Sequence, residues 1–163
     1  MYFSLIDRIE LLVPDSHIVA TKSLSLAEEY LRDHFPNFPV MPGVLMLEAL
    51  TQSAAWLIRV SQEFANSLVL LKEVKGVRYG KFVQPGQMLR IETSFVKRDE
   101  NLTYVKSEGT VDAKTTLRAQ LVLESTNVTD KYPGRSFADE KLTKRLKENL
   151  ALIWPEYSTR LYG

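Results

Sequence analysis

The sequence predicts an α+β domain in which an antiparallel sheet wraps around one long buried helix. Residues 42–63 follow a helical pattern and are apolar on nearly every side, so this helix has to be enclosed rather than laid on a surface. Residues 67–124 form a series of short strand patterns separated by turn signals. The chain shows no alternation of strands and helices, which a parallel sheet would require.

Composition limits the class of protein further. The chain has 163 residues, 45% of them hydrophobic and 25% charged, with a formal net charge of +1, which is typical of one globular domain and argues against a nucleic-acid binder. Cysteine is absent, so a disulfide framework and a thiolate nucleophile are excluded. Asp7 and Glu10 interrupt the first ten residues, and no apolar run reaches the ~20 residues of a membrane span. We therefore expect a cytoplasmic protein with no membrane segment.

The elements follow one another in a simple order. A β-branched strand over 16–26 precedes a proline-rich loop at 33–42 and the long helix. Five strands are predicted after it, at 67–74, 77–83, 88–98, 102–111 and 117–124. The clearest turns between them are Pro85-Gly86 and Asp99-Glu100-Asn101.

The tail differs from the rest of the chain. Ser136 and Asp139 have the spacing of a capping box, and a stripe of apolar residues follows until Pro155: Leu142, Leu146, Leu150 and Ile153. We expect this amphipathic helix to pack on the domain or on a partner subunit. The sequence thus divides into a main domain at 1–125 and a C-terminal helical extension at 126–163.

His34 and Glu48 are the candidate catalytic residues. His34 lies in the stiff proline-rich loop, and its side chain titrates near neutrality. Glu48 is a lone carboxylate in an apolar helix, where it is costly without a partner or a function, and we expect burial to raise its pKa. The alternative, an ion pair with Arg59, is disfavoured because the two residues lie about 16 Å apart along the helix axis.

Two further residues complete this candidate site. Gln52 shares a helix face with Glu48, so it either hydrogen-bonds that carboxylate or a departing water, or merely satisfies the interior. Gly43 begins the helix, where its backbone N–H can polarise a carbonyl. His17 has no partner at metal-ligand spacing and no nucleotide-binding glycine motif occurs, so neither a metal nor a cofactor is expected.

These residues also form a longer motif. It comprises His34-Phe35-Pro36, Pro39-Val40-Met41-Pro42-Gly43-Val44-Leu45, Glu48-Ala49-Leu50 and Gln52, with Val83-Gln84-Pro85-Gly86 downstream. The motif resembles the active-site signature of the FabZ-type β-hydroxyacyl-acyl carrier protein dehydratases, and the resemblance covers roughly residues 5 to 124. It implies the hotdog fold, a curved antiparallel sheet around a central helix, which agrees with the prediction above.

The resemblance implies a function. The chain would reversibly dehydrate (3R)-hydroxyacyl-acyl carrier protein to the trans-2-enoyl product, with His34 as base and Glu48 as acid facing each other from two subunits. The partners would be an acyl carrier protein bearing a 4'-phosphopantetheine-linked substrate and a second copy in a homodimer, with a trimer of dimers left open. Phe35, Phe38, Met41 and Met46 would line the acyl tunnel, and Arg78 and Lys81 would meet the carrier. Two alternatives stay open, a hotdog acyl-thioesterase and a non-catalytic acyl-chain binding subunit.

Overall fold

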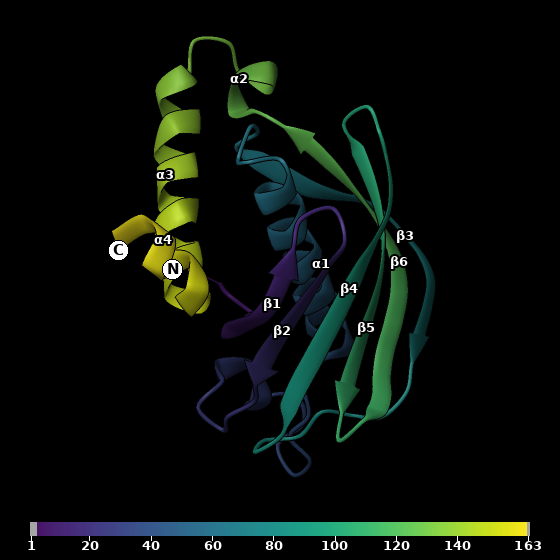
Figure 1. The fold of residues 1–163 in the computed structure, drawn as a ribbon. Helices are drawn as coiled ribbons and strands as arrows, with labels where there is room; N and C mark the ends of the chain where they lie inside the picture. Colours follow the sequence, from purple (N-terminus) through teal and green to yellow (C-terminus); the bar gives the residue numbers. More distant parts are fainter. Residues whose placement is uncertain (1–2, 163) are drawn as a thin grey trace.

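The computed structural model describes residues 3–162, and a six-stranded antiparallel sheet is its main layer (Figure 1). Its strands are β1 (Arg8–Val13), β2 (His17–Ser23), β3 (Leu68–Tyr79), β4 (Met88–Asp99), β5 (Leu102–Val111) and β6 (Lys114–Thr126). They lie in the order β1-β2-β4-β5-β6-β3, which makes β1 and β3 the two edges. This is the sheet of the hotdog fold that the resemblance implies.

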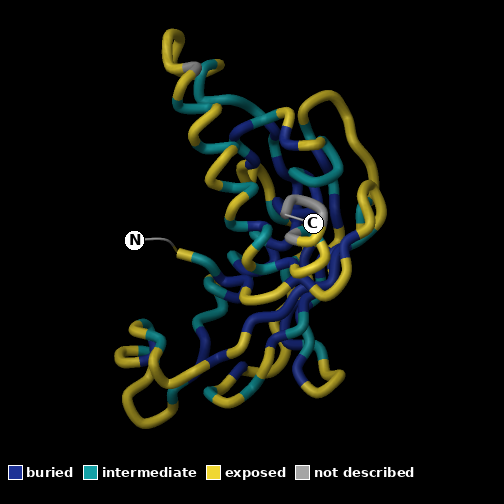
Figure 2. The backbone as a smooth tube through the Cα atoms, turned by 60° about the vertical axis from the view of Figure 1, so that its left-hand side comes forward, coloured by how far each residue is buried: buried dark blue, intermediate teal, exposed yellow. Residues whose placement is uncertain are grey.

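Helix α1 (Gly43–Ser61) lies across the sheet and forms the centre of the core. Leu50, Leu57 and Ile58 of this helix are fully buried together with Ile91 of β4 and Leu121 of β6. Figure 2 shows buried backbone in the middle of the molecule, while exposed residues lie at the turns and along parts of β3 and α3. The predicted helix enclosed by strands is therefore confirmed.

The strands differ from the prediction at two places. Strand β1 was not predicted, because a register shift between Ile9 and Leu11 breaks the alternation that marks a strand. The strands predicted at 67–74 and 77–83 are one strand, β3, which continues through Gly76 at a φ of +60° and ends at Tyr79. Two register shifts against β6 absorb the irregularity, and residues 81–83 are not part of the sheet.

Complete enclosure of α1 is not reached within one chain. Its second half is buried almost throughout, but near its start Val44 is 70% exposed and Leu45, Leu47 and Glu48 are only half-buried. This open side of α1, defined here by those four residues, places apolar surface and a carboxylate next to each other. One protomer therefore leaves part of the predicted core uncovered.

The C-terminal extension packs back onto the domain. It consists of α2 (Val128–Lys131), α3 (Ser136–Ile153) and α4 (Pro155–Tyr162), and a short 3-10 helix, η1 (Glu29–Leu31), precedes the proline-rich loop. Leu150 and Trp154 are buried in the same hydrophobic cluster as Leu5 and Leu50. Of the two predicted alternatives, the domain itself or a partner subunit, the structure shows packing on the domain.

The predicted capping box is wrong. Helix α3 begins at Ser136, so its N-cap is Arg135, which makes no side-chain capping hydrogen bond, and Asp139 lies in the first turn. The Asp139 carboxylate accepts hydrogen bonds from the backbone N–H groups of Val128 (2.7 Å) and Thr129 (3.1 Å) and from the Ser67 hydroxyl. It therefore ties α3 to the start of α2 and to the segment before β3. The capping box of the extension lies instead at Asn127.

Candidate active site

The proline-rich loop folds into a tight structure that holds His34 in place. The Val40 N–H donates to the His34 carbonyl (3.0 Å), while Phe35 and Phe38 exchange backbone hydrogen bonds of 3.1 and 3.0 Å. The Met41 N–H donates to the Val83 carbonyl (2.9 Å), which attaches the end of the loop to the segment after β3. The half-buried His34 side chain is thus carried by a backbone that is fixed from within and at its C-terminal end.

The contacts of the His34 ring define which nitrogen is available. Its Nδ1 lies 3.0 Å from the Val40 carbonyl oxygen. A carbonyl oxygen only accepts hydrogen bonds, so Nδ1 must carry the proton in the neutral imidazole. The lone pair then resides on Nε2, which is the form a general base requires.

A pocket of about 350 Å³ adjoins His34. It is lined by His34, Phe35, Met41, Gly43, Met46, Tyr79, Gly80, Lys81 and Phe82. Four of the predicted site residues, His34, Phe35, Met41 and Gly43, therefore come together around one mostly apolar space. Phe38 does not line it but packs edge-on against Phe82, with 5.8 Å between ring centroids.

The start of α1 forms one wall of this pocket. Gly43 is the first helical residue, so its N–H has no acceptor within the helix. The Tyr79 hydroxyl donates to the Gly43 carbonyl (3.3 Å), and a Cβ added at Gly43 would lie 2.8 Å from the Tyr79 ring. A side chain at residue 43 would therefore displace this ring, and the glycine keeps the helix start open to a ligand.

Glu48 and Gln52 form a second group on α1. Gln52 Nε2 donates to Glu48 Oε1 (3.0 Å) and to the Phe3 carbonyl (3.4 Å), while its Oε1 accepts the Leu5 N–H (2.8 Å). Gln52 therefore makes both kinds of contact predicted for it, one to the Glu48 carboxylate and one to backbone groups, of which Leu5 is buried and Phe3 is exposed. The expected full burial of Glu48 is not found within the protomer, where its side chain is half-buried.

The two groups lie on different sides of the helix. Successive helical residues turn by about 100°, so Glu48, two residues after Met46, points about 200° away from it. Met46 lines the pocket beside His34, whereas Glu48 and Gln52 do not. The structure of one chain therefore places His34 and Glu48 in two separate groups.

The remaining predicted residues take different positions. Lys81 lines the pocket, whereas Arg78 lies on a polar groove on the sheet, opposite Arg118 in the register of β3 and β6. Arg59 lies over the Trp56 ring, 5.2 Å from its centroid. His17 contacts the neighbouring Ser16.

The described part of the chain has neither a metal-binding cluster nor a membrane-spanning helix. Within residues 3–162 no group of three or more ligating side chains could hold a metal ion. None of the helices in that part of the chain combines the length and apolar character needed to cross a bilayer.

Sequence reasoning missed Tyr79 and Phe82, the aromatic residues opposite the His34 loop. The fold explains why both residues line the pocket. Strand β3 ends at Tyr79, and the chain after it, which includes Phe82, passes the start of α1. The available signal was their spacing around Lys81, which we interpreted only as a charged position. The better indication of a binding surface is a pair of aromatic residues near a strand end, and the structure shows both side chains exposed.

Proteins similar in sequence to this chain include dehydratases of the FabZ type. Residues 1–120 match the family model described as the FabA-like domain. A protein of Pediococcus pentosaceus named 3-hydroxyacyl-(acyl-carrier-protein) dehydratase FabZ is 36% identical over 127 residues, covering 77% of this chain and 85% of that protein. The protein of the same name from Lactococcus lactis subsp. cremoris strain SK11 is 39% identical over 119 residues, covering 73% and 82%.

Solved structures support the fold. The dehydratase heterocomplex ApeI:P from Xenorhabdus doucetiae contains a chain with a TM-score of 0.62 and 18% identity, covering 77% of this chain and 85% of that one. A hypothetical thioesterase with coenzyme A from Streptococcus pneumoniae gives a TM-score of 0.54 and 16% identity, covering 73% and 84%. At these identities the similarity establishes a common fold and nothing about the reaction.

Proposed function

Because the chain belongs to the FabA-like family, we propose that it is a hydro-lyase that dehydrates (3R)-hydroxyacyl thioesters on an acyl carrier protein. The FabZ relatives carry this activity in their names, and the pocket beside His34 supplies an apolar space for the reacting part of an acyl chain. The observation that carries the proposal is the hydrogen bond from His34 Nδ1 to Val40, since it leaves Nε2 free to accept a proton.

The reaction follows from these side chains. His34 Nε2 removes the proton from C2, and the electron pair forms the C2–C3 double bond. The C3–O bond breaks, and a protonated Glu48 donates its proton so that the hydroxyl leaves as water. Gly43 donates its free N–H to the thioester oxygen, where negative charge develops. Gln52 holds Glu48 in place through its amide nitrogen.

The two halves of the site require a second copy of the chain. Within one protomer His34 and Glu48 lie on different sides of α1, and the open side of α1 leaves Val44 and Glu48 uncovered. Strand β3 has a free edge, which a second β3 can pair with in a symmetric dimer. We therefore propose a cytoplasmic homodimer in which each pocket combines His34 of one subunit with Glu48 of the other.

The carrier protein would approach the pocket from the side of Lys81. Acyl carrier proteins are acidic, and Lys81 lines the pocket, whereas Arg78 lies apart from it on the sheet. The attached prosthetic arm would enter between Phe35 and Tyr79. In this proposal residues 1–125 carry the chemistry, and the extension at 126–163 supports the domain from outside the catalytic pocket.

The first test is a direct assay. Purified protein with a 3-hydroxyacyl carrier thioester should produce the absorbance of a conjugated enoyl thioester without releasing thiol. Thiol release with a free carboxylate product would instead indicate a thioesterase. Lack of both reactions at several chain lengths would favour an acyl-binding subunit.

The shared site has its own test. His34→Ala and Glu48→Gln should each abolish dehydration while the dimer stays intact. After dissociation and remixing of the two variants, about a quarter of the wild-type activity should return, because half of the dimers are mixed and each restores one site. No recovery in a confirmed heterodimer would contradict a site built from two subunits.

A further inference from the structure

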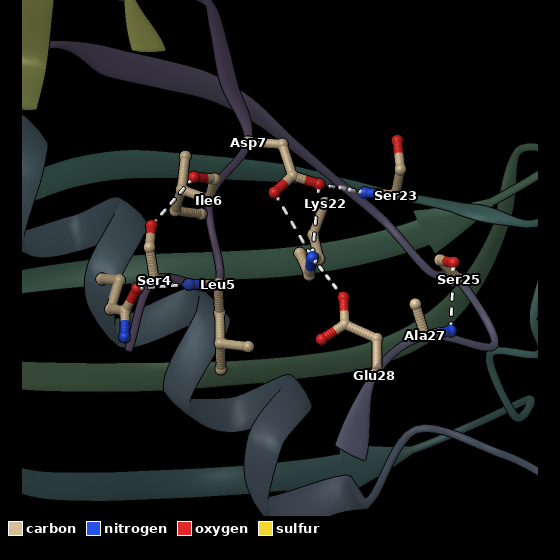
Figure 3. Close-up of polar contacts among 10 residues, drawn as sticks. Ser4, Leu5, Ile6, Asp7, Lys22, Ser23, Ser25, Ala27 and Glu28 are labelled. Carbon is tan, nitrogen blue, oxygen red and sulfur yellow. Dashed lines mark hydrogen bonds and ion pairs between the residues drawn. The ribbon is translucent and has the colours of Figure 1, made fainter. Parts of the chain in front are cut away.

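Lys22 is a buried cation between two partly exposed carboxylates, in a polar cluster outside the pocket. Its side chain is 8% exposed, and its Nζ lies 2.7 Å from Glu28 Oε1 and 3.3 Å from Asp7 Oδ1 (Figure 3). Asp7 also accepts the Ser23 N–H at 2.7 Å. The cluster thus joins three separate segments: the residues before β1, strand β2 and the turn before η1.

The charges in this cluster stabilise each other. Burial alone would lower the pKa of Lys22, but the hydrogen bonds and negative charges of Glu28 and Asp7 outweigh it and raise the pKa above its usual value. Burial, together with the same two carboxylates, raises the pKa of the neighbouring Tyr30 hydroxyl. Lys22 therefore stays charged, and the removal of either carboxylate would leave the buried ammonium less well compensated.

Glu28 connects the cluster to the loop that carries His34. The Glu28 carbonyl accepts the Leu31 N–H (3.1 Å), and the Leu31 side chain is buried. The proline-rich loop begins directly after this turn and reaches His34 three residues later. Lys22 thus fixes the start of the loop, whose end is fixed by the hydrogen bond from Met41 to Val83.

Asp7 connects the cluster to the group that contains Glu48. Asp7 ends a short segment, residues 3–7, in which Ser4 and Leu5 lie beside α1, as the close-up in Figure 3 shows. In this segment the Leu5 N–H donates to Gln52 Oε1 (2.8 Å), and Gln52 donates to Glu48 (3.0 Å). Through Glu28, Lys22 therefore contacts the turn before the His34 loop, and through Asp7 it contacts the segment that is hydrogen-bonded to Gln52.

We propose that Lys22 is a positioning residue, which sets the His34 loop through Glu28 and the Glu48–Gln52 pair through Asp7. The inference rests on the proposed dehydratase function and adds a residue that touches neither substrate nor the reacting groups. An ion cluster of this kind contributes little net stability compared with a well-packed apolar one, but it demands one geometry. Loss of the Lys22 ion cluster should therefore change the positions of the His34 loop and the Glu48–Gln52 pair before it changes the stability of the fold.

The kinetic test compares three variants. Lys22→Met keeps the volume and removes the charge, Lys22→Arg keeps a cation between the carboxylates, and Lys97→Met is the matched control for an exposed lysine on β4. Lys22→Met should lose about 10²-fold in kcat with KM changed less than about threefold, as expected for a small displacement of catalytic groups. Lys22→Arg should recover most of the kcat, and Lys97→Met should match the wild type.

A second measurement is independent of activity. The chain has only two histidines, so ¹³Cε1-histidine labelling gives one NMR signal for His34 and one for His17 as an internal reference. Lys22→Met should shift or broaden the His34 signal and leave that of His17 unchanged. If Lys22→Met does not fold, Glu28→Gln, which keeps the shape and removes one charge, should produce the same selective change.

The outcomes separate this inference from the proposed function. Wild-type kcat and an unchanged His34 signal in folded Lys22→Met would overturn the positioning role while leaving the dehydratase intact. A wild-type protein without dehydratase activity would overturn the function, and the NMR comparison would still decide whether Lys22 sets the loop. A loss of stability with kcat unchanged below the unfolding transition would show a purely structural role and would also overturn the inference.

Discussion

Leu150→Ala tests whether the C-terminal extension is part of the cooperative core. Leu150 is 0% exposed and belongs to the same buried cluster as Leu5 and Leu50. Truncating a buried leucine costs about 2–5 kcal/mol, and α3 can move partly into the space, so we expect about 3 kcal/mol. For a chain of this size that corresponds to a fall in Tm of about 6–12 °C at matched protein concentration.

The two tryptophans make this prediction specific. Trp56 lies in α1 and Trp154 directly follows α3, and both are buried. Urea unfolding followed by fluorescence, in Trp56→Phe and Trp154→Phe backgrounds, reports on each part separately. Leu150→Ala should lower both midpoints equally, whereas Leu152→Ala, at an 81% exposed position, should change stability by less than about 0.5 kcal/mol.

A divergence between the two probes would refute the reasoning. If Leu150→Ala lowered the Trp154 midpoint and left that of Trp56 unchanged, the extension would unfold by itself. The buried cluster would then consist of two independent units, and α3 would add nothing to the stability of the sheet and α1.

Three further changes have defined outcomes. The hydrogen bond from Ser67 and those at the start of α2 lower the pKa of Asp139 from 3.8 to about 2. The contribution of Asp139 to stability is therefore present above about pH 4 and is lost as the pH falls toward 2. Between about pH 6 and pH 2.5 the Tm of Asp139→Asn should therefore fall less than that of the wild type. Gly80→Ala would place a Cβ in steric conflict with the backbone oxygen of Thr115 in β6 and should destabilise the fold by about 1–3 kcal/mol in urea unfolding. Gly43→Ala meets only a movable tyrosine ring, so unfolding should hardly change, while kcat/KM should fall about tenfold in the enoyl assay.

The central helix and most strands could be predicted because their patterns are local. Apolar residues on every side of 42–63 require enclosure, and the Pro85-Gly86 turn is specified by a glycine at a φ of +85°. Strand β1 could not be found in this way, since its register shift removes the alternation. The continuity of β3 through Gly76 depends on pairing with β6, which lies far away in the sequence.

The candidate site was predictable by residue but not by arrangement. His34, Gly43 and Met41 could be assigned to one pocket because the loop and the helix start are consecutive in the chain. The contact between Gln52 and Leu5 spans 47 residues of sequence and has no local signature. The partial exposure of Glu48 could not be predicted either. A helical pattern shows which residues are apolar, but it does not show which side of the helix a single chain covers.

The hydrophobic cluster that contains both Leu5 and Leu150 has a consequence for biosynthesis. Leu5 leaves the ribosome long before Leu150, so its buried surroundings are completed late, because α3 is translated only after the whole sheet. Until then the nascent chain presents apolar surface along α1 and the segment of residues 3–7. Slow translation or premature termination near residue 126 should therefore yield a chain that needs chaperones, even though every strand of its sheet has already been made.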